Sequence, residues 1–583
     1  MNEKTKINTK LVMIISLGFL FLLRLINLDA DLPSWGIVNY QPMDEGQYAT
    51  MALNEINYGS LRLDLSLENN QFLTSAHIRN NVIGNFFVYL GLLLFGDNYY
   101  GFRCSSVLIG LVNFVLFCMI LQKIQRKYSD LKNERKNRFA YITLVLLFLF
   151  DFVYTVACRV VETSIYRMLF LQLIILAFYI FEGNEFYESK GRFFISGFLS
   201  VVSVFAVYIT NIFIPVAIFF TIIFCGISKG KKCFLNGLMS FIAGCGLAYV
   251  ICDLYYNFVW GTSCIVNTMQ IIKDFSGISG YTNGNYFTPI LNFFSSNSNL
   301  YNISFLFLVL LVIPIVVKKI FKEKDINNFF LVSCVIALLL QTIINEDYIV
   351  RKYIMIYPIA IYLFFYFWVN NPIIEVKNYF SKHKILKIMY SIFCIFVCVF
   401  LVMYRLFFIE NSTYKDFSII DRCMISVQLV FLFIIGLVIL FCVFRKKKCF
   451  QNVLTSFLIL VVLGCTLTNV YFSAKYIYLN DSYTEKDVMV KLGETVGDDY
   501  VYGIYSIAFT LYNDIKPVVN AHDIQGEEIN EQNIRWYLDY SNFMFPEEIL
   551  GDRSAEWNEL EIYKRNFSTF GKKNSVSLYE IIH

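Results

Sequence analysis

The sequence predicts an all-α polytopic membrane protein of about thirteen transmembrane helices, followed by a small α/β domain. Of the 583 residues, 57% are hydrophobic and only 16% are charged, and the mean hydropathy is +0.55. A soluble core could not bury so much apolar surface. Apolar runs recur up to about residue 473, after which the composition shifts to Asp, Glu, Asn and Tyr. We therefore predict a transmembrane domain at 1–473 and a C-terminal domain at 474–583.

A helix that crosses a membrane needs roughly 20 mostly apolar residues. Residues 11–28 form the first such run, and no small-residue cleavage site follows it, so we expect a retained span. The shorter run at 82–95 is expected to be a helix in or near the outer interface. The other predicted spans are 104–121, 139–157, 163–181, 192–209, 212–226, 234–252, 301–317, 328–344, 353–369, 388–407, 424–444 and 451–473.

Basic loops give the orientation, because Lys and Arg accumulate in cytoplasmic loops. The loop 122–138 is the most basic segment and is predicted to be cytoplasmic, as is the N-terminus. The basic clusters at 229–232, 318–324, 382–387 and 445–448 then fall on the same side. The long loop 29–103 and the C-terminal domain are expected outside, which implies a multi-pass protein of the plasma membrane.

The C-terminal domain carries strand-like runs at 500–504, 517–520 and 576–581 and a helix-like run at 533–540. The fifteen cysteines show neither CxxC nor Cys-His clusters with metal-ligand spacing, so they are interpreted as small membrane hydrophobes. Nothing in the composition indicates nucleic acid as a partner, and the net charge of +4 says little without its placement.

Charged residues gather at the predicted outer boundary, where they are costly unless they are paired or used. The first outer loop holds Asp44 and Glu45, with Arg79 downstream, and Arg159 and Glu162 flank a short outer turn. A later outer turn adds Glu346, Asp347, Arg351 and Lys352.

Each group also has a plain structural interpretation. Asp44 with Gln47 three residues on fits a capping box for a helix through Tyr48. Arg159 and Glu162 could be an interfacial ion pair at i, i+3, and the run at 351–353 could anchor a helix end by snorkelling. Carboxylates beside several cations on one face, however, suit an acceptor hydroxyl that must lose a proton and a phosphate leaving group that must be stabilised.

Two segments of the first outer region carry a resemblance. Residues 21–28 (FLLRLINL), a polar spacer and residues 44–49 (DEGQYA) resemble the opening of the C-type (GT-C) membrane glycosyltransferases. The resemblance is to the group of protein O-mannosyltransferases, lipid A aminoarabinose transferases and bacterial polyprenyl-phosphate-sugar transferases. Residues 85–96 and 101–110 resemble the interfacial helix and next span of that family, and 159–164 (RVVETS) resembles its second acidic outer motif.

The resemblance covers about the first 180 residues, with a looser later match at Lys352, Tyr353 and Pro358. It departs from the family where a basic residue or His is usually followed by proline. This chain has Arg79 followed by Asn-Asn-Val, with His77 nearby. Which of the two would meet a lipid phosphate is therefore left open.

The resemblance implies an inverting transfer of a sugar from a polyprenyl-phosphate donor to an acceptor hydroxyl on a glycan, lipid or protein at the outer face. Asp44 matches the family's general base, and Glu45 would orient the acceptor or a neighbouring base. The resemblance implies substrate-binding roles for Tyr48, His77, Arg79, Arg103, Arg159, Glu162, Arg351, Lys352 and Tyr353. Some relatives use a divalent metal such as Mg²⁺ or Mn²⁺ and others do not, so metal use is left open.

The alternative function is a transporter or flippase of a lipid-linked or cell-envelope precursor. A transporter is expected to place ionisable or helix-breaking residues near the midplane, in corresponding positions of two halves. The centres of the predicted spans are nearly free of charge and no internal repeat is visible, which favours the enzyme. A ligase or polymerase of lipid-linked polysaccharide would differ from it only in substrate.

Overall fold

The structure is a computed structural model that describes most of the chain. The described residues are 17–19, 21–33, 42–59, 61, 79–128, 134–181, 190–277, 301–345, 354–370, 388, 392, 418–428, 430, 434, 450–480, 482–503, 506–518, 535–540, 557–567 and 574–581. They form two compact units. One comprises residues 1–111, 156–166 and 474–583, and the other comprises 112–155 and 167–473.

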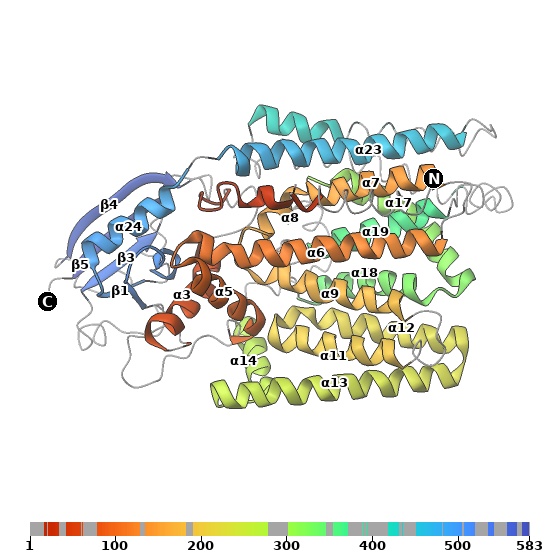
Figure 1. Cartoon of the computed structure of the whole chain (residues 1–583), viewed down its shortest axis with the longest axis horizontal. Helices are drawn as coiled ribbons and strands as arrows, with labels where there is room; N and C mark the ends of the chain where they lie inside the picture. The colour runs from red at the N-terminus through yellow and green to blue at the C-terminus, as the bar shows by residue number, and fades with distance from the viewer. Residues whose placement is uncertain are drawn as a thin grey trace, which may run out of the picture. The chain divides into compact units, whose positions relative to one another are not determined.

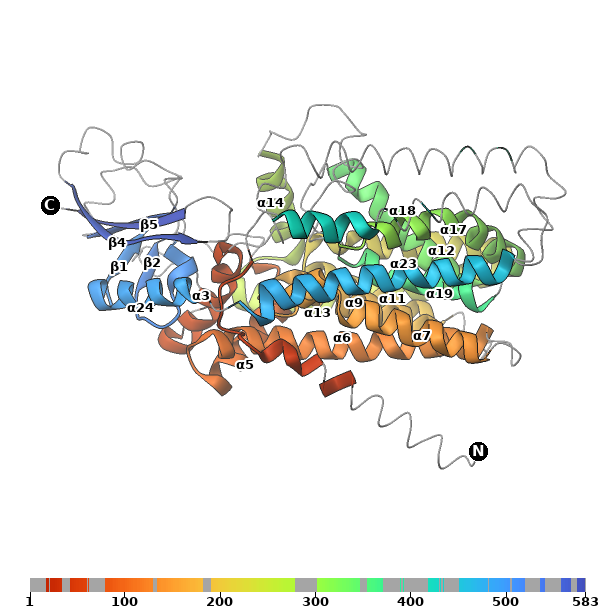
Figure 2. The same ribbon diagram turned by 90° about the horizontal axis from the view of Figure 1, so that it is seen from above.

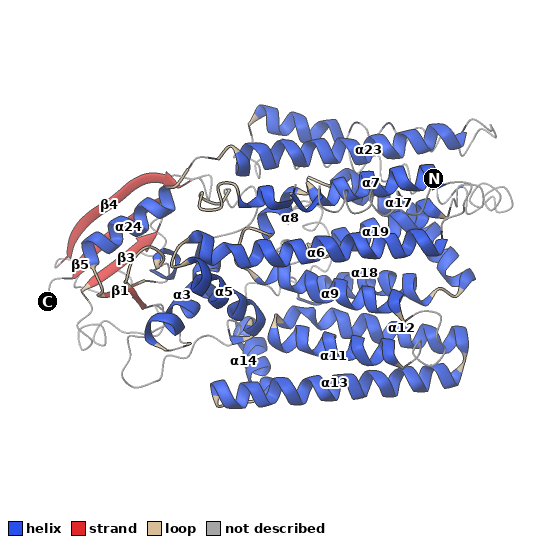
Figure 3. Cartoon of the chain, in the orientation of Figure 1, coloured by secondary structure: helices blue, strands red, loops and turns tan. Residues whose placement is uncertain are grey.

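The second unit is helical (Figures 1 and 3). Its described helices are α7 (Glu134–Leu149), α11 (Gly191–Ala206), α12 (Phe213–Lys229), α13 (Lys231–Trp260), α14 (Cys264–Gly277), α17 (Ile303–Glu323), α18 (Ile326–Asn345), α19 (Ile356–Val369) and α23 (Phe450–Ser473). It also contains the C-terminal part of α6 (Tyr99–Tyr128), most of α8 (Phe152–Ala157) and most of α9 (Thr163–Ile180). Helix α11 packs on α13, α12 packs on α18, and α17 packs on α19. Stacked rings join some of these helices, as in the pair Phe178 and Phe330, whose centroids lie 4.3 Å apart.

Within the described residues, five helices are long and apolar enough to cross a membrane, or six if the bent pair 303–310 and 312–323 counts as one span. The predicted fold class of a helical membrane protein with a small C-terminal α/β domain is confirmed. The predicted spans at 388–407 and 424–444 and most of the one at 11–28 lie outside the described residues, so the number thirteen stays a prediction. The domain boundary after residue 473 also stays a prediction.

One predicted span is two helices. The run 139–157 divides into α7 and α8, with buried Asp151 at the break. The Asp151 carboxylate accepts the Tyr154 amide at 2.6 Å, and the Asn469 side chain accepts the Phe152 amide at 2.9 Å. Side chains thus supply the partners that the broken helix loses, as an apolar environment requires.

The first unit contains the short helix η1 (Leu23–Leu25), α3 (Pro42–Tyr58), α5 (Val82–Phe95), the start of α6, and the C-terminal segment. The run predicted as a short interfacial helix is indeed a helix, α5. Helix α3 begins at Pro42, two residues before Asp44, so the prediction that Asp44 is an N-cap is wrong. Proline is favoured in the first turn of a helix, because its missing N–H has no partner there in any case.

The C-terminal segment folds into a mixed sheet with α24 (Thr484–Val496) against one face (Figure 2). The strand order is β2-β1-β3-β5-β4. Its elements are β1 (Tyr500–Tyr502), the turn η8 (Ser506–Phe509), β2 (Lys516–Val518), β3 (Trp536–Tyr540), β4 (Trp557–Phe567) and β5 (Asn574–Ile581). Strand β1 pairs parallel with β2 and β3, whereas β5 pairs antiparallel with β3 and β4.

The helix predicted at 533–540 is wrong, because Trp536–Tyr540 is strand β3. Its sequence WYLDY is rich in aromatic residues, which favour strands. Trp536, Tyr537 and Leu538 are buried, and β3 lies between β1 and β5. Consecutive side chains of a strand point to opposite faces, so three buried residues in a row mean that both faces are covered here, and the sequence lacks the polar and apolar alternation of a half-exposed strand.

Candidate functional site

The charged residues of the first unit meet around an ion pair between α3 and α6. Arg103 Nη2 lies 2.7 Å from Glu45 Oε2, and Arg103 Nε donates to Glu45 Oε1 at 3.1 Å. The two side chains are 1% and 4% exposed. A buried charge pair of this kind is favourable only when its geometry is good and its other polar atoms are satisfied. The parallel, two-bond arrangement meets the first requirement.

The remaining hydrogen bonds of Arg103 meet the second requirement. Its Nη1 donates to the carbonyls of Leu28 at 2.8 Å and Ala30 at 2.9 Å. The guanidinium also lies 4.0 Å from the centroid of the Tyr99 ring, one helical turn earlier on α6. Arg103 therefore joins α3, α6 and the chain segment that follows η1.

Glu45 is bound on a third side. Its Oε1 accepts the backbone N–H of Val161 at 3.0 Å, in the turn between α8 and α9. The neighbouring Glu162 accepts the Ser164 amide at 3.0 Å and the Ser164 hydroxyl, at the first residues of α9. The bond from the Val161 backbone to the Glu45 side chain thus brings the two acidic motifs of the sequence together. The Glu45 carboxylate is engaged, and the acid beside it in the chain is Asp44, whose side chain lies outside the described part.

Arg159 belongs to the same turn and is buried. Its Nη1 donates to the carbonyls of Arg24 at 2.8 Å and Ile26 at 2.6 Å, and its Nη2 donates to the carbonyl of Asn27. Burial, with the charges of Arg103 and Arg24, lowers the pKa of Arg159 to about 9. The guanidinium therefore stays charged at neutral pH, and it is bound by carbonyls, which leave its positive charge uncancelled.

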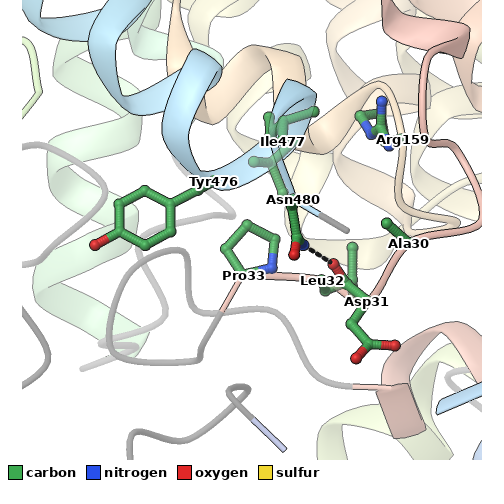
Figure 4. Close-up of a pocket in the computed structure, with 9 residues that line it drawn as sticks. Ala30, Asp31, Leu32, Pro33, Arg159, Tyr476, Ile477 and Asn480 are labelled. Atoms are coloured by element: carbon green, nitrogen blue, oxygen red, sulfur yellow. Dashed lines mark hydrogen bonds between the residues drawn. The ribbon is translucent and has the colours of Figure 1, made fainter. Parts of the chain in front are cut away.

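A pocket of about 250 Å³ lies beside Arg159 (Figure 4). Its lining residues are Ala30, Asp31, Leu32, Pro33, Val156, Arg159, Tyr476, Ile477 and Asn480. The Asn480 amide donates to the Asp31 carbonyl at 2.9 Å and closes one wall. As it stands, the pocket has room for only about one water molecule.

A second pocket of about 230 Å³ lies between α3 and the C-terminal segment. It is lined by Glu45, Gly46, Ala49, Tyr99, Phe102, Met489, Ile507, Ala508, Thr510 and Leu511. Most of these groups are apolar, so the pocket offers few polar partners to a sugar or a phosphate.

Five of the predicted site residues lie in the first unit and are described there by their contacts or their burial. Glu45, Arg103, Arg159 and Glu162 have the contacts given above, and Tyr48 is buried on α3. Arg79 is half-buried and lies three residues before the first residue of α5. The predicted residues His77, Arg351, Lys352 and Tyr353 lie outside the described residues.

Sequence reasoning missed Asp31, Tyr99 and Glu485. Tyr99 stands four residues before Arg103, so the helical i, i+4 spacing could have indicated it. Asp31 and Glu485 are 454 positions apart, and no local pattern links them. Among the described residues no group of three or more His, Cys, Asp or Glu side chains could hold a metal ion.

Comparisons with known proteins place the fold. No family model and no curated protein matches the sequence. The crystal structure of ArnT from Cupriavidus metallidurans bound to undecaprenyl phosphate matches at a TM-score of 0.54 and 10% identity, over 98% of both chains. Its apo form matches at 0.51 and 10% identity, over 99% of this chain and 98% of that one. ArnT is the lipid A aminoarabinose transferase, so the GT-C resemblance of the sequence is confirmed at the level of the fold.

Proposed function

We propose that this protein is an integral-membrane glycosyltransferase. It transfers a sugar from a polyprenyl-phosphate donor to an acceptor hydroxyl on the outer face of the membrane. The support is the GT-C fold along nearly the whole chain, in common with a protein whose structure holds undecaprenyl phosphate. The acceptor is a glycan, a lipid or a protein, and the metal requirement stays open.

The reaction is an inverting displacement with Asp44 as general base. The acceptor hydroxyl attacks the anomeric carbon, its proton passes to Asp44, and the bond from the anomeric carbon to the phosphate oxygen breaks. The single observation that carries the assignment is the engagement of Glu45 by Arg103 and by the Val161 amide. Both oxygens of the Glu45 carboxylate are already bound, and these bonds fix the helical turn that contains Asp44. Glu45 is thus a positioning residue.

The departing polyprenyl phosphate keeps the electron pair of the broken bond and needs cations more than a proton donor. Arg159 fits this need, because it is charged at neutral pH and lines a pocket in the same unit. Arg79 or His77 is the second candidate, and Arg351 and Lys352 are further ones. Tyr48, Arg103 and Glu162 are the remaining substrate-binding candidates in the first unit, and Tyr353 is a candidate from the sequence alone.

The proposed orientation follows from the basic loops. The N-terminus lies in the cytoplasm, and the loop 29–103, the turn with Arg159 and Glu162, and the C-terminal domain lie outside, in a plasma membrane. All the acids and cations of the proposed site in the first unit are then on one side of the bilayer.

The test is transfer by the purified full-length protein in lipid nanodiscs. A first experiment finds which lipid-linked sugar accumulates in cells that lack the protein. The transfer assay then supplies a panel of polyprenyl-phosphate sugars that includes this one, with envelope extracts as the source of acceptors. We expect release of polyprenyl phosphate, and a new glycosidic bond of inverted anomeric configuration. Passage of the intact lipid-linked sugar across proteoliposome membranes without a new bond would contradict the proposal and identify a flippase.

A further inference from the structure

Glu485, the second residue of α24, is a buried acid outside the proposed catalytic set. Its side chain is fully buried. The Tyr99 hydroxyl donates to Oε2 at 3.1 Å, and Oε1 has no hydrogen-bond partner among the described residues. A buried carboxylate with one oxygen unpartnered is costly in its charged form. Burial, reinforced by Asp31, raises the pKa of Glu485 well above its usual value, which favours the neutral acid.

A continuous series of contacts runs from Glu485 to α3. The Tyr99 ring, whose hydroxyl binds Glu485, lies beneath the Arg103 guanidinium. Arg103 in turn binds both oxygens of Glu45. Four side chains from α24, α6 and α3 are therefore connected, and the last of them is the neighbour of Asp44 in the chain.

The start of α24 is held by the same segment that receives Arg103. The Asp31 carboxylate accepts the amides of Thr484 at 3.0 Å and Glu485 at 2.9 Å, and the Ser482 hydroxyl at 2.6 Å. One residue earlier, the carbonyl of Ala30 accepts Arg103 Nη1 at 2.9 Å. The position of Glu485 is thus fixed by backbone bonds, and the position of Arg103 is fixed from two directions.

Helix α3 also rests on the C-terminal domain at η8. The Thr50 hydroxyl lies 2.9 Å from the Thr510 hydroxyl and 3.3 Å from the Ile507 carbonyl. A Cβ at Gly46 would stand 2.1 Å from the Ile507 carbonyl oxygen, so only glycine allows this approach. The C-terminal domain therefore contacts the first turns of α3 directly.

We propose that Glu485 is a positioning residue through which the C-terminal domain, by way of Tyr99 and Arg103, sets the position of α3 and hence of Asp44. The inference rests on the proposed function for its catalytic consequence. It assigns the C-terminal domain a part in the transfer reaction itself. The Glu485 carboxyl acts by its shape and its hydrogen bond to Tyr99. The charged and titratable groups that face it are Asp31, Glu45, Tyr99 and Arg103.

The activity test compares Glu485→Ala with Glu485→Gln in the full-length protein in nanodiscs. Because Gln resembles the neutral acid in size and hydrogen bonding, Glu485→Gln is expected to keep kcat. Glu485→Ala is expected to lose about 10²-fold in kcat, as misplaced catalytic groups do, with an unchanged KM for the donor. Glu494→Ala is the matched control, since Glu494 lies on the same helix and is exposed. Equal kcat for Glu485→Ala and wild type overturns the proposal.

A second readout does not depend on transfer. Hydrogen–deuterium exchange of residues 42–58 is expected to rise in Glu485→Ala and in Tyr99→Phe, which removes only one hydroxyl, and to stay at the wild-type level in Glu485→Gln and Glu494→Ala. If Glu485→Ala does not fold, Tyr99→Phe alone decides. Unchanged exchange of α3 in the folded variants overturns the positioning role. If the wild type transfers no sugar while exchange rises as expected, only the proposed function fails.

Discussion

At the scale of single residues, the site depends on which polar groups are already bound. Glu45 and Arg103 were both identified from the sequence, yet their pairing could not be, because the partners are 58 positions apart and meet only in the tertiary structure. Their predicted roles toward substrate stay predictions. No sequence pattern indicated the roles of Asp31 and Glu485, since a single acid in a polar loop or at a helix start is common.

The raised pKa of Glu485 gives a prediction about stability. The folded chain binds the Glu485 proton more tightly than the unfolded chain does, so the contribution of this group to stability is fully present below pH 4.5 and is lost as pH rises toward the folded-state pKa. Glutamine does not titrate. We therefore expect Glu485→Gln to gain stability relative to wild type as pH rises above 4.5, by at most about 1.4 kcal/mol per pH unit.

Thermal unfolding of both proteins from pH 4 to pH 9 in one detergent measures this difference. The exposed Glu494→Gln serves as the control and should follow the wild type. A Tm difference between Glu485→Gln and wild type that is constant across the range would mean that Glu485 has no raised pKa.

At the scale of elements, apolar length predicted helices well and local chemistry predicted their ends less well. Helix α5 lies at the residues predicted, 82–95, because polar residues bound the apolar run at both ends and so define the ends of the helix. The start of α3 was misplaced, since Pro42 begins the helix before Asp44. The break at Asp151 and the strand at 536–540 were missed, because both depend on partners distant in sequence, Asn469 for the first and β5 for the second.

The contact between α3 and η8 is tested at this scale by Gly46→Ala. The new methyl group would meet the Ile507 carbonyl and the Ala508 Cα, which are backbone atoms. We expect the free energy of unfolding to fall by about 1–3 kcal/mol, which is typical of overpacking, and we expect slower sugar transfer. The control is Gly246→Ala on α13, where nothing lies within 4 Å of the added atom and alanine should favour the helix. Equal thermal stability of the two variants would show that α3 does not approach η8 this closely.

At the scale of the whole molecule, composition and basic loops were enough to predict a polytopic helical membrane protein, and the GT-C resemblance is confirmed by the fold. The similarity to ArnT, at a sequence identity of 10%, extends to the fold and does not identify the sugar or the acceptor. The reason is physical, because specificity depends on a few side chains around the reacting atoms, whereas the fold depends on many apolar ones.

The central claim is that Asp44 removes the proton of the acceptor hydroxyl. Its most direct test is the transfer rate of purified Asp44→Asn, which keeps the shape of the side chain and removes its basicity. We expect kcat to fall by about 10²–10⁴-fold, the range of general base catalysis, with folding and insertion unchanged. Glu55→Gln, further along α3, is the matched control and should retain wild-type kcat. Transfer by Asp44→Asn at a rate near that of the wild type would contradict the account.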